Sequence, residues 1–242
     1  MTVHLVGGGP GDPDLITVRG LELLREADAV VYDELAPLEL LAELPVTALQ
    51  IPRAGMRQSQ IDDLLVSLGR RFETVVRLKG GDPFLFGRGR EEVDALAAAG
   101  IPCEVVPGVS ALTAVPAAAG IPLTHRGLSA QVTIITARSA GDDDLDFEQL
   151  AQTPGTLVIF MGVARLEELA DGLVAAGKAA DTPAAVIANG TTDHQETIVG
   201  RLDEIAQTAR DLPSPALTVI GPTAAFALTG ARLGDPAQLA LA

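Results

Sequence analysis

Cysteine is almost absent from this chain of 242 residues, and Cys103 is the only one. An internal disulfide and a metal site built from several cysteines are therefore excluded. The three histidines, His4, His125 and His194, are scattered without the spacing of metal ligands, so we expect no bound metal. These features fit a protein of the reducing cytoplasm.

Long apolar runs and positive charge are also scarce. No run reaches the roughly 18 residues of a membrane-spanning helix, and residues 1–11 lack the basic flank and cleavage site of a signal peptide. Seventeen Lys and Arg stand against 32 Asp and Glu, a net charge of −15. We therefore expect neither a membrane nor a nucleic acid as a partner. The acidity indicates a well-solvated surface or adaptation to salt, and local arginines can still bind a small anion.

Short apolar runs alternate with helical patterns along the chain, which is typical of an α/β fold with buried parallel strands. The expected strands are residues 3–6, 29–32, 74–78, 104–106, 132–135, 156–160, 184–188, 197–199 and 217–220. Helical spacing relates Ile61, Leu64, Leu65 and Leu68, then Val93 and Leu96, and later Leu166, Leu169, Leu173 and Val174.

The length allows one large domain or two small ones. Pro107-Gly108, Pro116 and Gly120-Ile121-Pro122 interrupt the pattern near the middle. We therefore expect two α/β domains, 1–114 and 115–242, joined near residues 112–122. The stretch Thr191 to Gln195 resembles a turn between two strands, which predicts some antiparallel pairing in the second domain.

The first expected strand leads directly into a glycine-rich loop, Gly7-Gly8-Gly9-Pro10-Gly11-Asp12-Pro13. Glycines let the backbone turn sharply and let a ligand approach closely. The loop is not the dinucleotide pattern G-x-G-x-x-G, because Asp12 replaces the third glycine and Pro10 lacks a backbone donor. It indicates either a structural turn or a site for a ligand without phosphates.

A second loop follows the strand at 74–78 and reads Arg77-Leu78-Lys79-Gly80-Gly81-Asp82-Pro83-Phe84-Leu85-Phe86-Gly87-Arg88-Gly89-Arg90-Glu91-Glu92. It combines four glycines, four basic residues and an aspartate, more charge than chain flexibility alone requires. Asp82 and its two preceding glycines can face an amine-bearing ligand. Arg88 and Arg90 can bind carboxylates through the guanidinium fork. The alternative is a solvated surface loop.

Motifs spread over most of the chain resemble, in the same order, those of the uroporphyrinogen-III C-methyltransferase family of the tetrapyrrole methylase superfamily. The matching stretches are residues 6–13, 32–33, 77–92, 105–111, 120–126, 160–162 and 189–191. The resemblance implies two α/β domains with S-adenosylmethionine in the cleft between them, and a homodimer. It implies cofactor contacts from Pro10, Gly80, Gly81, Asp82, Leu85, Ser110, Ala111, Met161 and Gly190. Without the motifs, Met161 would be read as core and Ser110 as a helix cap.

The resemblance also implies methylation of uroporphyrinogen III at carbons 2 and 7, giving precorrin-2 for sirohaem and cobalamin biosynthesis. Asp33, at the end of a strand, is then a proton acceptor or orients the substrate; the alternative is a helix N-cap. Substrate carboxylates are expected at Arg53, Arg88, His125 and Arg126, with Arg77, Lys79, Arg90 and Arg138 as further candidates.

The chain departs from the family pattern in its residues at two places, and the region after Met56 is also shorter by a few residues. Ile51-Pro52-Arg53-Ala54-Gly55 stands where members usually have Gly-Lys-Arg, and Arg53 is a poor proton donor. Thr136-Ala137-Arg138 stands where Thr-Gly-His is common. Alternatives are a methylase of a later corrin precursor, a nucleotide-dependent oxidoreductase, which the missing fingerprint disfavours, and a binding module without turnover.

Overall fold

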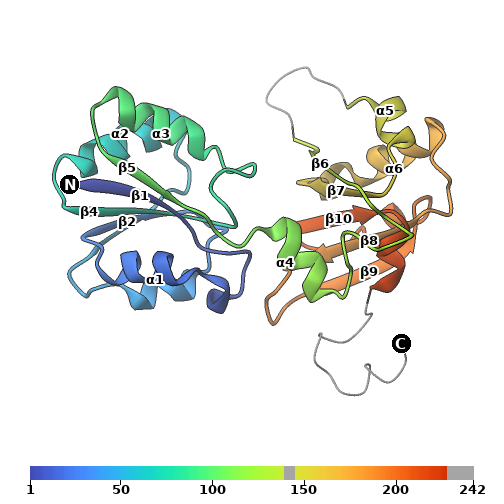
Figure 1. The fold of residues 1–242 in the computed structure, drawn as a ribbon, viewed down its shortest axis with the longest axis horizontal. Helices are drawn as coiled ribbons and strands as arrows, with labels where there is room; N and C mark the ends of the chain where they lie inside the picture. The colour runs from blue at the N-terminus through green and yellow to red at the C-terminus, as the bar shows by residue number, and fades with distance from the viewer. Residues whose placement is uncertain (139–144, 228–242) are drawn as a thin grey trace. The chain divides into compact units, whose positions relative to one another are not determined.

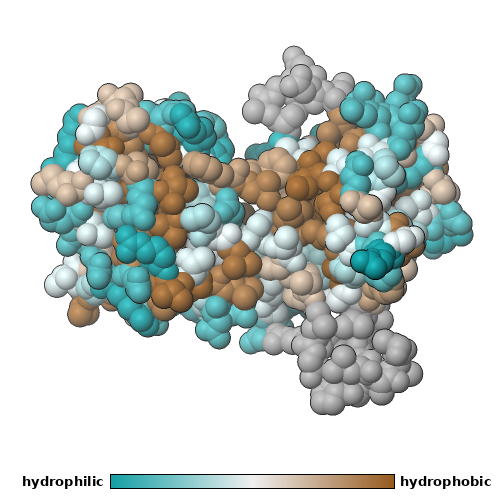
Figure 2. Space-filling view, viewed as in Figure 1, coloured by the Kyte–Doolittle hydropathy of each residue, from teal (hydrophilic) through white to brown (hydrophobic). Residues whose placement is uncertain are grey.

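The computed structural model describes residues 1–138 and 145–227. The chain divides into two compact units, Met1–Ala111 and Leu112–Ala242, three residues before the expected boundary. Each unit contains one five-stranded sheet with helices against it, and the expected pair of α/β domains is confirmed (Figure 1). On the face drawn in Figure 2, hydrophilic and hydrophobic residues are interspersed in both units.

The sheet of the first unit is entirely parallel. Its strands are β1 (Thr2–Gly7), β2 (Ala29–Tyr32), β3 (Leu49–Pro52), β4 (Thr74–Lys79) and β5 (Cys103–Val106), in the order β3-β2-β4-β1-β5. Because all strands run the same way, the loops after them meet at one edge, the carboxyl edge, where α/β folds bind ligands.

Helices cover both faces of this sheet. Along the chain they are η1 (Pro13–Leu15), α1 (Val18–Arg25), η2 (Leu38–Glu43), α2 (Gln58–Gly69) and α3 (Gly89–Ala98). Val76 and Leu78 of β4 pack in the cluster that includes Leu23 and Leu24 of α1. Val75 packs on the opposite face, in the cluster that includes Ile61 of α2 and Leu96 of α3. Burial on both faces explains why the strands expected from the sequence are continuous apolar runs.

The second unit has a mixed sheet. Its strands are β6 (Val132–Thr136), β7 (Thr156–Phe160), β8 (Pro183–Ala188), β9 (Glu196–Arg201) and β10 (Ala216–Ile220), in the order β6-β7-β10-β8-β9. Only β6 and β7 pair in parallel; the other pairs are antiparallel. The turn expected at Thr191 to Gln195 lies between β8 and β9, so the predicted antiparallel pairing is confirmed.

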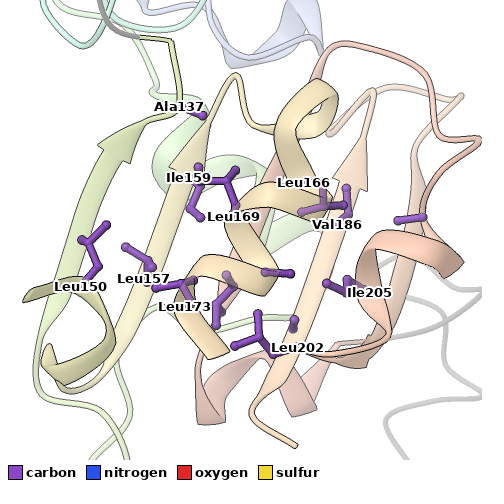
Figure 3. Packing of buried hydrophobic residues seen from close by; sticks show 14 residues of the cluster. Ala137, Leu150, Leu157, Ile159, Leu166, Leu169, Leu173, Val186, Leu202 and Ile205 are labelled. Atoms are coloured by element: carbon purple, nitrogen blue, oxygen red, sulfur yellow. The ribbon is translucent and has the colours of Figure 1, made fainter. Parts of the chain in front are cut away.

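The helices of the second unit are α4 (Ala111–Ala118), α5 (Phe147–Gln152), η3 (Val163–Arg165), α6 (Leu166–Ala175), α7 (Ile205–Thr208) and η4 (Pro222–Phe226). Figure 3 shows Leu166, Leu169 and Leu173 of α6 turned toward side chains of β7 and β8. The predicted stripe of leucines therefore forms the centre of this unit's core.

One expectation about the secondary structure was wrong. Pro116 does not break the pattern but lies inside α4. A proline there removes one backbone donor, so this helix of eight residues loses one hydrogen bond and persists. Among the described residues, no helix is both long enough and apolar enough to span a membrane.

Candidate functional site

Three glycines, at the end of β1 and in the loops after β4 and β5, meet at the carboxyl edge of the first sheet. A Cβ built on Gly108 would lie 2.2 Å from the carbonyl oxygen of Gly81, and one on Gly7 would lie 2.5 Å from Cα of Gly108. The N–H of Gly81 also donates to the carbonyl of Gly9 at 2.6 Å. The space beside Gly7 is thus filled by backbone, so this glycine serves the fold rather than a ligand.

Asp82 holds these loops together. Its Oδ1 accepts a hydrogen bond from the backbone N–H of Phe84 at 2.8 Å, and its Oδ2 accepts one from Gly108 at 3.1 Å. The sequence suggested that this carboxylate faces an amine-bearing ligand. In the structure each oxygen already accepts a hydrogen bond from a backbone N–H. Only the second lone pair of each oxygen is left to bind a ligand.

Gly81 differs from its neighbour Gly80. A Cβ on Gly80 would lie 2.6 Å from the carbonyl oxygen of Leu35, whereas one on Gly81 would meet only the backbone nitrogen of Ala111, at 3.8 Å. Gly81 is glycine because its φ is +63°, and the space beside it is open. Loops at this edge carry the expected cofactor residues of the first unit: Pro10, Gly80, Gly81, Asp82, Leu85, Ser110 and Ala111.

The other two expected cofactor residues lie in the second unit. Met161 follows β7 and Gly190 follows β8, and these strands run the same way because both are antiparallel to β10. Met161 is 45% exposed, so it is not a core side chain. Its φ is 55°, and Thr191, beside Gly190, has a φ of 71°. Such values strain residues with a Cβ and are concentrated at functional loops.

Asp33 lies at the carboxyl end of β2, with its N–H bonded to the carbonyl of Leu78. Nη2 of Arg77 donates to Oδ1 of Asp33 at 2.5 Å. Nε of Arg53 lies 3.0 Å from the same oxygen as an ion pair, although its N–H is not aligned for a hydrogen bond. Asp33 is not a helix N-cap, because η2 begins after Pro37. Its side chain is bound by cations instead.

Two residues expected as further candidates for binding substrate carboxylates are buried, and that expectation was wrong. Arg77 and Lys79 both point to the α2 and α3 face of β4 and are almost fully buried. Each is bound to Glu92 of α3, Arg77 through Nε at 3.1 Å and Lys79 through Nζ at 3.0 Å. Burial, and then the charge of Arg77, lower the pKa of Lys79. Neither side chain lines a surface that a substrate could reach.

The remaining cations of the second loop are exposed. Arg88 binds Glu91 through Nε and Nη2, at 2.8 and 2.6 Å, and this bond raises the pKa of Arg88 and lowers that of Glu91. Arg90 contacts Oδ1 of Asp94 on α3 through Nε and Nη2, at 2.9 and 2.7 Å. A substrate carboxylate at Arg88 would therefore have to displace Glu91.

His125 and Arg126 lie in an exposed turn of the second unit. The N–H of His125 donates to the carbonyl of Ser129, and the imidazole stacks on Phe226 with ring centroids 5.2 Å apart. Arg126 and Arg138 are exposed. Over residues 1–138 and 145–227, no group of three His, Cys, Asp or Glu could hold a metal ion.

Sequence reasoning missed Glu92. It was read only as part of a charged loop, yet it is fully buried and binds both Arg77 and Lys79. The signal was present in β4: two basic residues at alternate positions of an apolar strand point to one buried face. Such charges require a buried anion.

The fold and the site define a two-domain α/β protein with glycine loops and an arginine-bound aspartate at one sheet edge. The model of the family described as tetrapyrrole (corrin/porphyrin) methylases matches residues 2–206. The chain belongs to this family.

Proteins of known structure share this fold. The uroporphyrin III C-methyl transferase of Thermus thermophilus is 38% identical, with a TM-score of 0.82, covering 92% of this chain and 93% of that one. It is also known in complex with S-adenyl homocysteine. A cobalt precorrin-4 methyltransferase is 29% identical, with a TM-score of 0.84 over 91% of this chain and 94% of that one.

The chain is also similar in sequence to a curated relative. Siroheme synthase 1 of Yersinia enterocolitica is 47% identical over 226 residues, which are 90% of this chain and 48% of that protein. The chain thus spans about half the length of the curated relatives it matches.

Proposed function

We propose that this chain is an S-adenosylmethionine-dependent methyltransferase that methylates uroporphyrinogen III at carbons 2 and 7. The product, precorrin-2, would serve sirohaem and cobalamin biosynthesis. The observation that carries the proposal is the match over nearly the whole Thermus uroporphyrin III C-methyl transferase. The position of Asp33 at the carboxyl edge of the first sheet supports it, because α/β folds bind their ligands at that edge.

The glycine loops fit S-adenosylmethionine, a cationic ligand without phosphates. Pro10 offers no backbone donor for a phosphate, and the space beside Gly81 is open to the backbone of Ala111. When bound, S-adenosylmethionine supplies a methyl group on a sulfonium sulfur. The residues proposed to hold it are Pro10, Gly80, Gly81, Asp82, Leu85, Ser110, Ala111, Met161 and Gly190.

Uroporphyrinogen is an electron-rich ring of pyrroles, so the protein need not generate a strong nucleophile. Its main task is to hold the reacting carbon in line with the methyl group. A ring that has gained a methyl group is cationic and must lose a proton. Asp33 would accept that proton at Oδ2, because Arg53 and Arg77 both contact Oδ1.

The carboxylates of the substrate would be bound by arginines and a histidine. Arg53 is half-exposed beside Asp33, and its guanidinium can bind a carboxylate through its outer nitrogens. Arg88, His125 and Arg126 are the other proposed contacts, and all three are exposed.

A methylase of a later corrin precursor is the second candidate. The fold match to the cobalt precorrin-4 methyltransferase favours it, as does Arg53 in the place of the family's usual lysine. Substrate choice within a shared fold is decided by the pocket. We further propose two domains, 1–114 and 115–242, and a cytoplasmic homodimer, which the single cysteine and the family resemblance support.

The test is an anaerobic incubation of the purified protein with S-adenosylmethionine and uroporphyrinogen III, followed by mass spectrometry of the tetrapyrrole. Gain of two methyl groups supports the proposal. No gain, with S-adenosylhomocysteine still bound in calorimetry, contradicts it and directs the search to later corrin precursors. A parallel incubation with precorrin-2 as substrate distinguishes these two cases.

A further inference from the structure

Five charged side chains form a chain of alternating sign inside the first unit. The order is Lys79, Glu92, Arg77, Asp33 and Arg53, and each contacts the next within 3.1 Å. Lys79, Glu92 and Arg77 are buried, whereas Asp33 and Arg53 are partly exposed. This series of ion pairs therefore runs from the buried face of the sheet to the carboxyl edge.

Arg77 is the central residue of this series of ion pairs, and its guanidinium is held in place. Its Nε donates to Glu92, its Nη1 to the carbonyls of Leu78 and Val31 at 3.1 and 3.4 Å, and its Nη2 to Asp33. All three guanidinium nitrogens are thus engaged, and the planar group has one orientation. Lysine, with a single ammonium, cannot reproduce contacts in these directions.

The consequence appears at Asp33. Among the interactions of the described residues, those of the Asp33 side chain reach Oδ1, from Arg77 and Arg53. Because all three guanidinium nitrogens of Arg77 have acceptors, Arg77 holds Oδ1 of Asp33 in place and leaves Oδ2 outside the pairing.

The side chains of Glu92 and Lys79 are both buried. Burying such a pair is costly, and apolar residues of similar size are often equally stable or better. The pair nevertheless supplies the anion that anchors Nε of Arg77, with Lys79 bound to both oxygens of Glu92. Gln58 of α2 adds a weaker contact to Glu92 at 3.5 Å.

We infer that Arg77 is a positioning residue for Asp33, and that Glu92 and Lys79 act through Arg77. The inference rests on the proposed function, in which Asp33 accepts a proton at Oδ2. Arg77 contacts neither substrate nor cofactor in this account. It determines where the proton acceptor stands.

The first experiment replaces Arg77 by lysine and uses Arg201→Lys as the matched control. Arg201 also binds a carboxylate, that of Asp203, through Nε and Nη2, but on an exposed surface. In Arg77→Lys we expect kcat to fall about 10- to 100-fold, as for a misplaced reacting group. KM for both substrates and the Kd of S-adenosylhomocysteine stay at wild-type values. Wild-type kcat in a folded Arg77→Lys protein overturns the inference.

A double variant, Lys79→Met with Glu92→Met, covers the case in which Arg77→Lys does not fold. It removes both members of the Lys79–Glu92 pair together, and Asp33 remains the counterion of Arg77, whose Nε–H loses its acceptor. In a double variant that remains folded, we expect kcat to fall while KM is retained. A folded double variant with wild-type kcat contradicts the role of Glu92.

Crystal structures separate this inference from the proposed function. If wild-type protein transfers no methyl group, the proposed function fails, but the carboxylate of Asp33 can still be located in each variant. The inference requires that Asp33 moves in Arg77→Lys and stays in Arg201→Lys. An unmoved Asp33 carboxylate overturns it.

Discussion

Oδ2 of Asp82 accepts a hydrogen bond from the backbone N–H of Gly108, 26 residues further along the chain. This bond joins the loop after β4 to the loop after β5, at the point where Gly108 and the carbonyl of Gly81 touch. The open space beside Gly81 therefore depends on a junction that tolerates no side chain.

Gly108→Ala should disrupt that junction. The added Cβ would lie 2.2 Å from the carbonyl oxygen of Gly81, and neither backbone segment can yield cheaply. We expect a loss of about 3 kcal/mol, the upper range for overpacking, and a Tm lower by roughly 6–12 °C. Binding of S-adenosylhomocysteine should weaken as well. Gly200→Ala is the control, since its Cβ would make only ordinary contacts at 3.7 Å or more. An unchanged Tm for Gly108→Ala contradicts this account.

Asp33→Asn should lower turnover without loss of cofactor binding. The amide keeps the size of the carboxylate but cannot accept a proton at neutral pH. We expect kcat to fall by about 10²–10⁴, the usual contribution of a general base. Calorimetry should give an unchanged Kd for S-adenosylhomocysteine. Full activity in this variant would remove Asp33 from the mechanism.

Arg53→Met should weaken binding of the tetrapyrrole but not of the methyl donor. Arg53 is half-exposed beside Asp33, where its outer nitrogens can bind a substrate carboxylate. Loss of a charge-assisted hydrogen bond of about 1.5–3 kcal/mol corresponds to a KM roughly 10- to 100-fold higher. Arg70→Met, an exposed arginine after α2, is the control. Equal KM values in the two variants would exclude Arg53 as a substrate contact.

Cys103 should react slowly with alkylating reagents at neutral pH. Burial, and then the charges of Glu92 and Glu104, raise the pKa of its thiol from 9.0 to about 11. The thiolate is the reactive form, so alkylation by iodoacetamide should speed up about tenfold per pH unit up to that value. A raised pKa favours the folded state below pH 9, and this stability is lost as the pH rises toward 11. Thermal unfolding of wild type and Cys103→Ala across this range measures the loss. A rate that levels off near pH 9 contradicts the shift.

The sequence alone predicted most strands because a strand buried on both faces must be a continuous apolar run. β3 was missed, since it is an exposed edge strand that ends in Pro52. The helix containing Pro116 was missed because proline is disfavoured inside helices, although it removes only one backbone donor there.

The sequence by itself also indicated which residues lie at the carboxyl edge. Asp33 directly follows a strand, and glycine-rich loops follow two others, so their positions at one edge come from the parallel direction of the strands. The order of strands in a sheet is not written in local pattern. Only the tertiary structure placed β2 beside β4 and so brought Arg77 to Asp33, 44 residues apart. Only burial decided that Arg77 and Lys79 face Glu92 rather than a ligand, because a charge inside the protein must find its partner there.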